Sequence, residues 1–164
     1  MFWTLILVPC GLTVLAFGFV VIWGAPFLPT LRPQIKTALD LVDLKPGQIM
    51  LELGSGDGRV LAAAAERGID AIGYELNPLL VIYSWLRTRK YGRKVRIIWG
   101  SYWSREWPQA NGIFVFLLDK YMKKLDKKIV QNYPGQKVKL VSFAFKIPDK
   151  RPTQEQDGLY LYEY

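Results

Sequence analysis

The stretch LELGSGDGRV, Leu51–Val60, places three glycines within five positions directly after an apolar run. Glycine adopts positive φ at no steric cost and lets a ligand approach the backbone without a Cβ in the way. The residues LAAAAERG (61–68) follow and have the composition of a helix that ends at a glycine. In open α/β sheets, ligands bind outside the carboxyl end of the first strand. The stretch therefore predicts a strand, a tight turn that faces a ligand, and a helix.

The spacing of these glycines excludes two common nucleotide motifs. A dinucleotide fingerprint needs glycine or alanine where Arg59 stands, and a Walker A loop needs Gly-Lys-Ser/Thr. What remains is the pattern E-x-G-x-G-x-G, formed by Glu52, Gly54, Gly56 and Gly58. Glu75 ends the next expected strand, 21 positions after Gly54, where a carboxylate can accept both hydroxyls of a ribose. The pair predicts a site for an adenosine-bearing ligand; the alternative is a tight turn followed by an ordinary surface glutamate.

Strand and helix patterns alternate on both sides of this turn. The expected strands cover 48–53, 70–75, 94–99, 112–118, 137–145 and 158–164, and the expected helices cover 33–44, 59–67, 78–91 and 121–133. Such alternation predicts an α/β fold with a mostly parallel sheet and helices on both faces. A polar loop without a helix joins the last two strands, so an antiparallel strand pair is expected at that edge.

The amino-terminal part of the chain is apolar. No charged side chain occurs from Phe2 to Leu31, and the run Leu5–Gly24 has the length of a helix that spans a bilayer. A cleaved signal peptide and a buried core helix are the alternatives, and the absence of a basic residue before the run favours an uncleaved anchor. The cations lie after the run, so the positive-inside rule predicts a single-pass protein whose folded domain faces the cytoplasm. The location would be the inner membrane of a prokaryote or the matrix side of a mitochondrial membrane.

The composition limits the chemistry. The chain has no histidine, and its single cysteine, Cys10, lies in the apolar run, which excludes the usual zinc sites and Ser–His or Cys–His catalysis. The formal net charge is +8, with six cations in Arg87–Arg96 and five in Lys120–Lys128. Solvated helix faces, an anionic membrane surface and nucleic acid are three interpretations of these clusters. The absence of an RNA-recognition consensus argues against nucleic acid.

The glycine turn and the acid after it resemble motif I and the post-I acid of class I S-adenosylmethionine-dependent methyltransferases. LELGSGDGRV together with GYELNPLLVIYS (73–84) is similar to the membrane-anchored protein-lysine methyltransferases, which include the enzymes that act on the ATP synthase c-subunit and on the adenine nucleotide translocase. The resemblance implies a Rossmann-like methyltransferase domain over 48–164, after a transmembrane anchor over 1–28 and a linker with an amphipathic helix over 29–47. It also implies S-adenosyl-L-methionine as cofactor and a lysine of a membrane or membrane-associated protein as acceptor, with contact to the bilayer through the N-terminal helix.

The resemblance also assigns cofactor-binding positions by their place in the motifs. They are Glu52, Gly54, Ser55, Gly56, Asp57, Gly58, Glu75, Leu76, Asn77 and Ser101. The turn residues would line the methionine part, with the two acids of the motif near its amino group. Glu75 would hold the ribose, and the two residues after it would border the adenine. Ser101 stands where such enzymes usually carry an acid near the adenine amino group.

Methyl transfer from a sulfonium needs no metal, so the main task is to align the acceptor, for which proximity is worth roughly 7–11 kcal/mol. A lysine acceptor must lose its proton, and an apolar slot favours the neutral amine. Tyr102, Trp103 and Asp119 follow the third and fourth strands and are the candidate catalytic residues. The alternatives are loop-packing aromatics and a helix cap. A methyltransferase for RNA, lipid or a small molecule and a non-catalytic membrane scaffold are the alternative functions.

Overall fold

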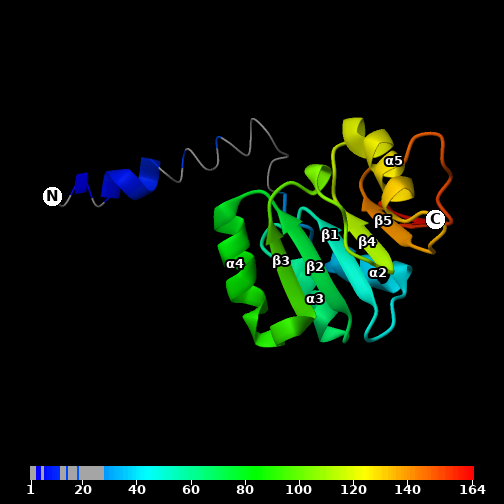
Figure 1. The fold of residues 1–164 in the computed structure, drawn as a ribbon, viewed down its shortest axis with the longest axis horizontal. Helices are drawn as coiled ribbons and strands as arrows, with labels where there is room; N and C mark the ends of the chain where they lie inside the picture. The colour runs from blue at the N-terminus through cyan, green and yellow to red at the C-terminus, as the bar shows by residue number, and fades with distance from the viewer. Residues whose placement is uncertain (1–2, 5, 12–13, 15–17, 19–27) are drawn as a thin grey trace.

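A seven-stranded sheet forms the centre of the protein in the computed structural model, which describes residues 3–4, 6–11, 14, 18 and 28–164. The strands are β1 Ile49–Leu53, β2 Asp70–Glu75, β3 Val95–Trp99, β4 Gly112–Val115, β5 Lys139–Phe143, β6 Gln154–Gln156 and β7 Leu159–Glu163. Their spatial order is β3-β2-β1-β4-β5-β7-β6. The β3 end of the sheet carries α4, and the C-terminus lies at the opposite end (Figure 1).

The first five strands run parallel, and β7 pairs antiparallel with β5 and with β6. The register sets Leu51 of β1 beside Ile72 of β2 on one side and Ile113 of β4 on the other. All three side chains are buried, as a central parallel strand requires. The predicted Rossmann-like sheet, mostly parallel with an antiparallel pair at one edge, is confirmed.

Helices cover the two faces of the sheet. On one face, Met50 and Phe114 of the sheet share a core with α2 (Arg32–Val42) and α3 (Arg59–Glu66). On the other face, Leu51 and Val115 pack with α5 (Met122–Asn132) and with the loop that joins β3 to β4. The helix α4 (Pro78–Thr88) contacts α3 and β3. Because β1 to β4 run parallel, their carboxyl ends lie on the same side of the sheet, beside the glycine turn.

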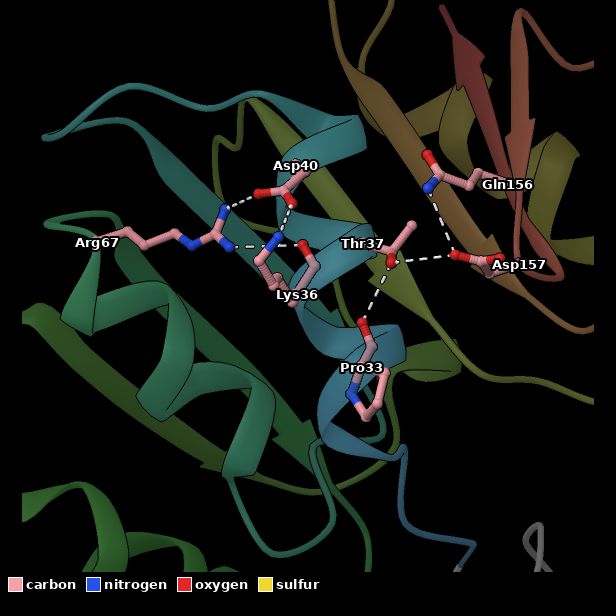
Figure 2. Close-up of polar contacts among 7 residues, drawn as sticks. All are labelled: Pro33, Lys36, Thr37, Asp40, Arg67, Gln156 and Asp157. Carbon is pink, nitrogen blue, oxygen red and sulfur yellow. Dashed lines mark hydrogen bonds and ion pairs between the residues drawn. The ribbon is translucent and has the colours of Figure 1, made fainter.

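Polar contacts link α2 to two other parts of the fold (Figure 2). Asp40 accepts hydrogen bonds from Lys36 in its own helix and from Arg67 after α3, and these bonds hold the pKa of its carboxyl below its usual value. Thr37 lies within 3.4 Å of a carboxylate oxygen of Asp157 in the β6–β7 turn. Exposed pairs of this kind contribute at most about 1 kcal/mol each. The apolar side of α2, which includes the buried Leu39, supplies most of the packing energy.

Some elements differ from the predicted ones. The strand β6 (Gln154–Gln156) is polar and exposed throughout, so its sequence has no apolar alternation from which to predict a strand. Three short 3-10 helices were also not predicted: η1 Arg89–Lys94, η2 Tyr102–Ser104 and η3 Asp119–Tyr121. The fourth strand ends at Val115 rather than at residue 118, and the next residue, Phe116, lines the cavity.

The prediction of a membrane-spanning helix over Leu5–Gly24 is wrong. Among the described residues, no helix is long and apolar enough to cross a membrane. An apolar run spans a bilayer only where it forms one continuous helix of about 20 residues. The other residues of the expected anchor (1–2, 5, 12–13, 15–17 and 19–27) lie outside the described part. The predicted single-pass membrane location, with the domain facing the cytoplasm, depended on that helix and is contradicted by the same finding.

Candidate active site

A cavity opens at the carboxyl ends of the central strands, where the glycine turn was expected to face a ligand. Most of the predicted site residues line it: Glu52, Gly54, Ser55, Gly56, Asp57, Glu75, Leu76, Ser101, Tyr102 and Trp103. Gly58, Asn77 and Asp119 are not in its lining. Three elements far apart in sequence therefore converge on one site, as the parallel topology requires.

The three glycines of the turn have positive φ but serve two purposes. Gly54 has φ +94°, and a Cβ built on it would meet open space. Gly58 has φ +75° and caps α3, and a Cβ there would collide with the Ser84 hydroxyl of α4. The backbone at Gly54 therefore stays bare toward the cavity, whereas Gly58 lets two helices approach each other.

The Glu75 carboxylate faces the glycine turn rather than solvent. One of its oxygens accepts a hydrogen bond from the Gly56 amide at 2.7 Å, and the other accepts from the Asn77 amide at 2.8 Å. Burial raises the pKa of Glu75 above its ordinary value, although these hydrogen bonds oppose the rise. A carboxylate held in this way presents its remaining lone pairs to the cavity, where they can accept hydroxyl groups.

Glu52 lies deeper in the same wall and lacks a full set of partners. Among the described residues, its Oε2 atom and the Ser55 hydroxyl are buried without a hydrogen-bond partner. Burial, together with the charges of Glu75 and Asp57, raises the pKa of Glu52 well above its ordinary value. Buried polar atoms normally find partners, so these two atoms fit a ligand that brings polar groups into the cavity.

Two arginines neutralise Asp57. Arg59 pairs with it at 2.8 Å, and Arg87 of α4 pairs with it at 3.0 Å. Burial works to raise the pKa of Asp57, but the hydrogen bond from Arg59 and the charges of both arginines outweigh it and leave the pKa lowered. Arg59 also donates to the Thr30 carbonyl at 3.2 Å, which ties residues 28–30 to the cavity they help to line. Sequence reasoning missed Thr30, because only tertiary contacts bring it to the site. It also missed Arg59, although its position directly after Gly58 was a usable signal.

The residues predicted near an adenine have local structural roles as well. Asn77 is fully buried and caps α4, since its side-chain oxygen accepts from the Leu79 amide at 2.9 Å. Ser101 caps η2 through a hydrogen bond from the Trp103 amide at 3.2 Å. Leu76 and Ser101 line the cavity, so they alone of this group can contact a ligand directly.

Aromatic side chains line another part of the cavity, which we call the aromatic wall. The ring centroids of Tyr102 and Trp103 lie 4.8 Å apart, and Trp103 lies 6.1 Å from Tyr121. Phe116, which follows β4, also lines the cavity and packs on Phe143 at 4.7 Å. Sequence reasoning missed Phe116, although its position directly after a strand was a usable signal. These rings give the cavity an apolar side.

The Tyr102 hydroxyl stays protonated at neutral pH. Burial raises its pKa, and the neighbouring Tyr121 and Glu75 raise it further. Tyr102 can therefore donate a hydrogen bond but cannot serve as a base. Asp119 is exposed at the start of η3, outside the cavity lining, so the structure brings Tyr102 and Trp103 together and leaves Asp119 apart.

The sheet order, the bare turn after β1 and the acid that ends β2 define the class I S-adenosylmethionine-dependent methyltransferase fold. An RNA methyltransferase from Salinibacter ruber, solved with S-adenosyl-L-homocysteine, superposes with a TM-score of 0.72 at 24% identity, over 84% of this chain and 92% of that one. A methyltransferase from Geobacter sulfurreducens, also solved with that compound, superposes with a TM-score of 0.57 at 20% identity, over 75% of this chain and 53% of that one. These likenesses establish the fold.

Residues 52–154 match the family described as the ANTKMT methyltransferase domain, and the chain belongs to this family. The ATP synthase c-subunit lysine N-methyltransferase of Xenopus laevis is 32% identical over 77% of this chain and 56% of its own length. The adenine nucleotide translocase lysine N-methyltransferase of Mus musculus is 30% identical over 84% and 62%. A protein-lysine N-methyltransferase of Saccharolobus islandicus (strain REY15A) is 27% identical over 84% and 92%. The chain thus spans little more than half the length of the first of these relatives.

Proposed function

We propose that this protein transfers a methyl group from S-adenosyl-L-methionine to the side-chain amine of a lysine in another protein. The observation that carries the proposal is the Glu75 carboxylate, which is hydrogen-bonded to Gly56 across a bare, cavity-facing turn. Family membership and the names of the relatives support a lysine acceptor. An acceptor protein at a membrane stays a prediction from sequence.

The residues of the cavity fit the cofactor. Glu75 would hold the ribose hydroxyls, and the unpartnered oxygen of Glu52 with the Ser55 hydroxyl would meet the polar groups of the methionine end. When bound, S-adenosyl-L-methionine supplies an electrophilic methyl group, so no metal is required. The paired arginines make Asp57 a positioning residue for the turn, because its charge is already balanced.

The aromatic wall prepares the acceptor. A lysine ammonium has a pKa of about 10.4 in water, so only a small fraction is neutral at pH 7. Tyr102 and Trp103 would exclude water from that amine, and desolvation shifts it toward its neutral, nucleophilic form. The released proton passes to bulk water, since the Tyr102 phenol is already protonated.

The first test is isothermal titration calorimetry of the purified protein with S-adenosyl-L-methionine, for which we expect saturable binding. The second measures transfer of a tritiated methyl group into cell extract, separated into protein, lipid and RNA, with label expected on protein lysines. An absence of binding at millimolar cofactor would overturn the proposal. Label found only in lipid or RNA would show that the acceptor is not a protein lysine. The assignment of the cofactor site would then still stand.

A further inference from the structure

Three lysines stand beside the aromatic wall of the cavity; we call Lys120, Lys124 and Lys128 the lysine rim. The Lys124 ammonium lies 4.4 Å from the ring centroid of Trp103, which lines the cavity. The Lys120 ammonium lies 5.0 Å from the ring centroid of Tyr121. Within the described part of the chain, the lysine rim forms no ion pair with an acidic side chain. The rim is therefore a set of lysines without acidic partners, and Lys124 brings it to the aromatic side of the cavity.

A fourth cation extends the rim to the other end of the aromatic wall. The Arg105 guanidinium donates to the Trp99 carbonyl at 3.4 Å and lies against Gly100, which lines the cavity. Its own carbonyl accepts a hydrogen bond from Lys128 at 2.9 Å. Burial and the charge of Lys124 lower the pKa of Lys128, and the charge of Glu106 opposes this lowering without reversing it.

The acids of this region do not balance these cations. Asp126 already accepts a hydrogen bond from Tyr164 at 2.6 Å and pairs with Lys150 at 3.5 Å. Asp119 and Glu106 are exposed and contact no rim lysine closely enough to form an ion pair. The rim therefore presents a net positive field to any molecule that enters the cavity from the aromatic side.

This field decides which lysine can be methylated, given the proposed lysine-methyltransferase function. An acceptor lysine is a cation, so its approach to the rim costs free energy unless neighbouring residues bring negative charge. We propose that the acceptor lysine lies in an acidic segment of its protein, and that carboxylates of this segment contact the lysine rim and Arg105. The same field favours the neutral form of the amine once it reaches the slot.

The structure favours a protein segment over a nucleic acid as the anionic partner. Single-stranded nucleic acids bind by stacking bases on exposed aromatic rings. At this wall, a lysine ammonium lies over Trp103 and another over Tyr121, at 4.4 and 5.0 Å from the ring centroids. One face of each ring is therefore occupied. Carboxylates that meet the ammonium groups need no stacking surface.

The test compares fluorescent peptides that bind the full chain in the presence of S-adenosyl-L-homocysteine, measured by fluorescence anisotropy. One peptide carries a single lysine flanked by aspartates, and its partner carries asparagines in the same places. We expect the acidic peptide to bind at least about tenfold more tightly at low salt and to lose this advantage as salt rises. The double variant Lys120→Gln/Lys124→Gln should weaken binding of the acidic peptide about fivefold and leave the asparagine peptide unchanged.

The matched control is Lys137→Gln, because Lys137 is an exposed lysine before the amino end of β5, whereas the cavity lies at the carboxyl ends of the parallel strands. Equal affinity for the two peptides, or an equal loss in the Lys137 variant, overturns the inference. A thymidine oligonucleotide with the same net charge as the acidic peptide is tested as a competitor. If it displaces that peptide from the wild type, and does so less well from the double variant, the inference is overturned in favour of nucleic acid. Cofactor binding is measured by calorimetry on the same sample. Loss of cofactor binding would contradict the proposed function, whereas cofactor binding without a preference for the acidic peptide would contradict only this inference.

Discussion

At the scale of single residues, two buried carboxylates at neighbouring strand ends differ in their partners. Glu75 is held by two backbone amides, whereas an oxygen of Glu52 has no partner among the described residues. Burial raises the pKa of both. The first is therefore positioned to recognise a ligand, and the second carries an electrostatic cost for the fold.

We expect Glu75→Gln to bind S-adenosyl-L-methionine about 10- to 100-fold more weakly, because a hydrogen bond to a charged group contributes about 1.5–3 kcal/mol. Calorimetry measures the affinity, and circular dichroism verifies that the fold is kept. The matched control is Glu163→Gln, an exposed glutamate at the far end of β7, which should bind the cofactor like the wild type. Equal weakening in both variants would contradict the role of Glu75.

The pH dependence of stability tests Glu52. Its pKa is higher in the folded protein than in the unfolded chain, so its contribution to stability is fully present below the unfolded pKa of about 4.3 and is lost as pH rises through the folded pKa. Glu52→Gln removes this loss. We expect the variant to melt at higher temperature than the wild type at pH 7, by about 2–4 °C for each kcal/mol relieved, and to lose this advantage near pH 4. Thermal melts across this range measure the difference, and a pH-independent difference would count against the assignment.

At the scale of elements, α4 has an unusual orientation. It buries the small polar residues Ser84 and Thr88 toward the rest of the fold and exposes Ile82 and Trp85. Ser84 packs against Gly58 at the start of α3. Close approach between these helices therefore depends on a glycine on one side and a small side chain on the other.

We expect Gly58→Ala to destabilise the protein by about 2–4 kcal/mol, because the new methyl group meets Ser84 and also strains a backbone with positive φ. Gly47→Ala is the matched control. Gly47 has φ +83°, yet a Cβ there meets nothing, so only the strain of about 1–2 kcal/mol applies. Urea unfolding measures both free energies. Equal losses in the two variants would show that helix packing does not explain Gly58.

At the scale of the whole molecule, the site is assembled from strand ends, loops and the segment before α2. Residues 28–30 reach it through the Arg59–Thr30 hydrogen bond, and the β3–β4 loop supplies the aromatic wall. A ligand that fills such a site contacts parts of the chain that separate on unfolding. Its binding therefore stabilises the entire fold by mass action.

We expect S-adenosyl-L-methionine at about 100 times its dissociation constant to add about 2.7 kcal/mol and to raise the melting temperature by about 5–10 °C. Differential scanning fluorimetry measures the shift. The Glu75→Gln variant, at the same cofactor concentration, should show a smaller shift. An equal shift of the melting temperature in that variant would show that Glu75 contributes little to cofactor binding.

The sequence by itself determined the parallel sheet, the glycine turn after β1 and the acid at the end of β2. These features depend on local backbone chemistry and on alternation along the chain, which a single sequence displays. It did not predict β6, whose polar residues carry no pattern. Its apolar N-terminal run led to a membrane helix that the described residues do not contain.

Only the tertiary structure decided which predicted residues meet. It paired Asp57 with Arg87, placed Gly58 against Ser84, set Asp119 outside the cavity and brought the lysine rim beside Trp103. Most of these contacts join residues from different elements, and their distances depend on how helices cross the sheet. A linear pattern carries no information on such crossings, because side-chain packing sets them only once the whole core has formed.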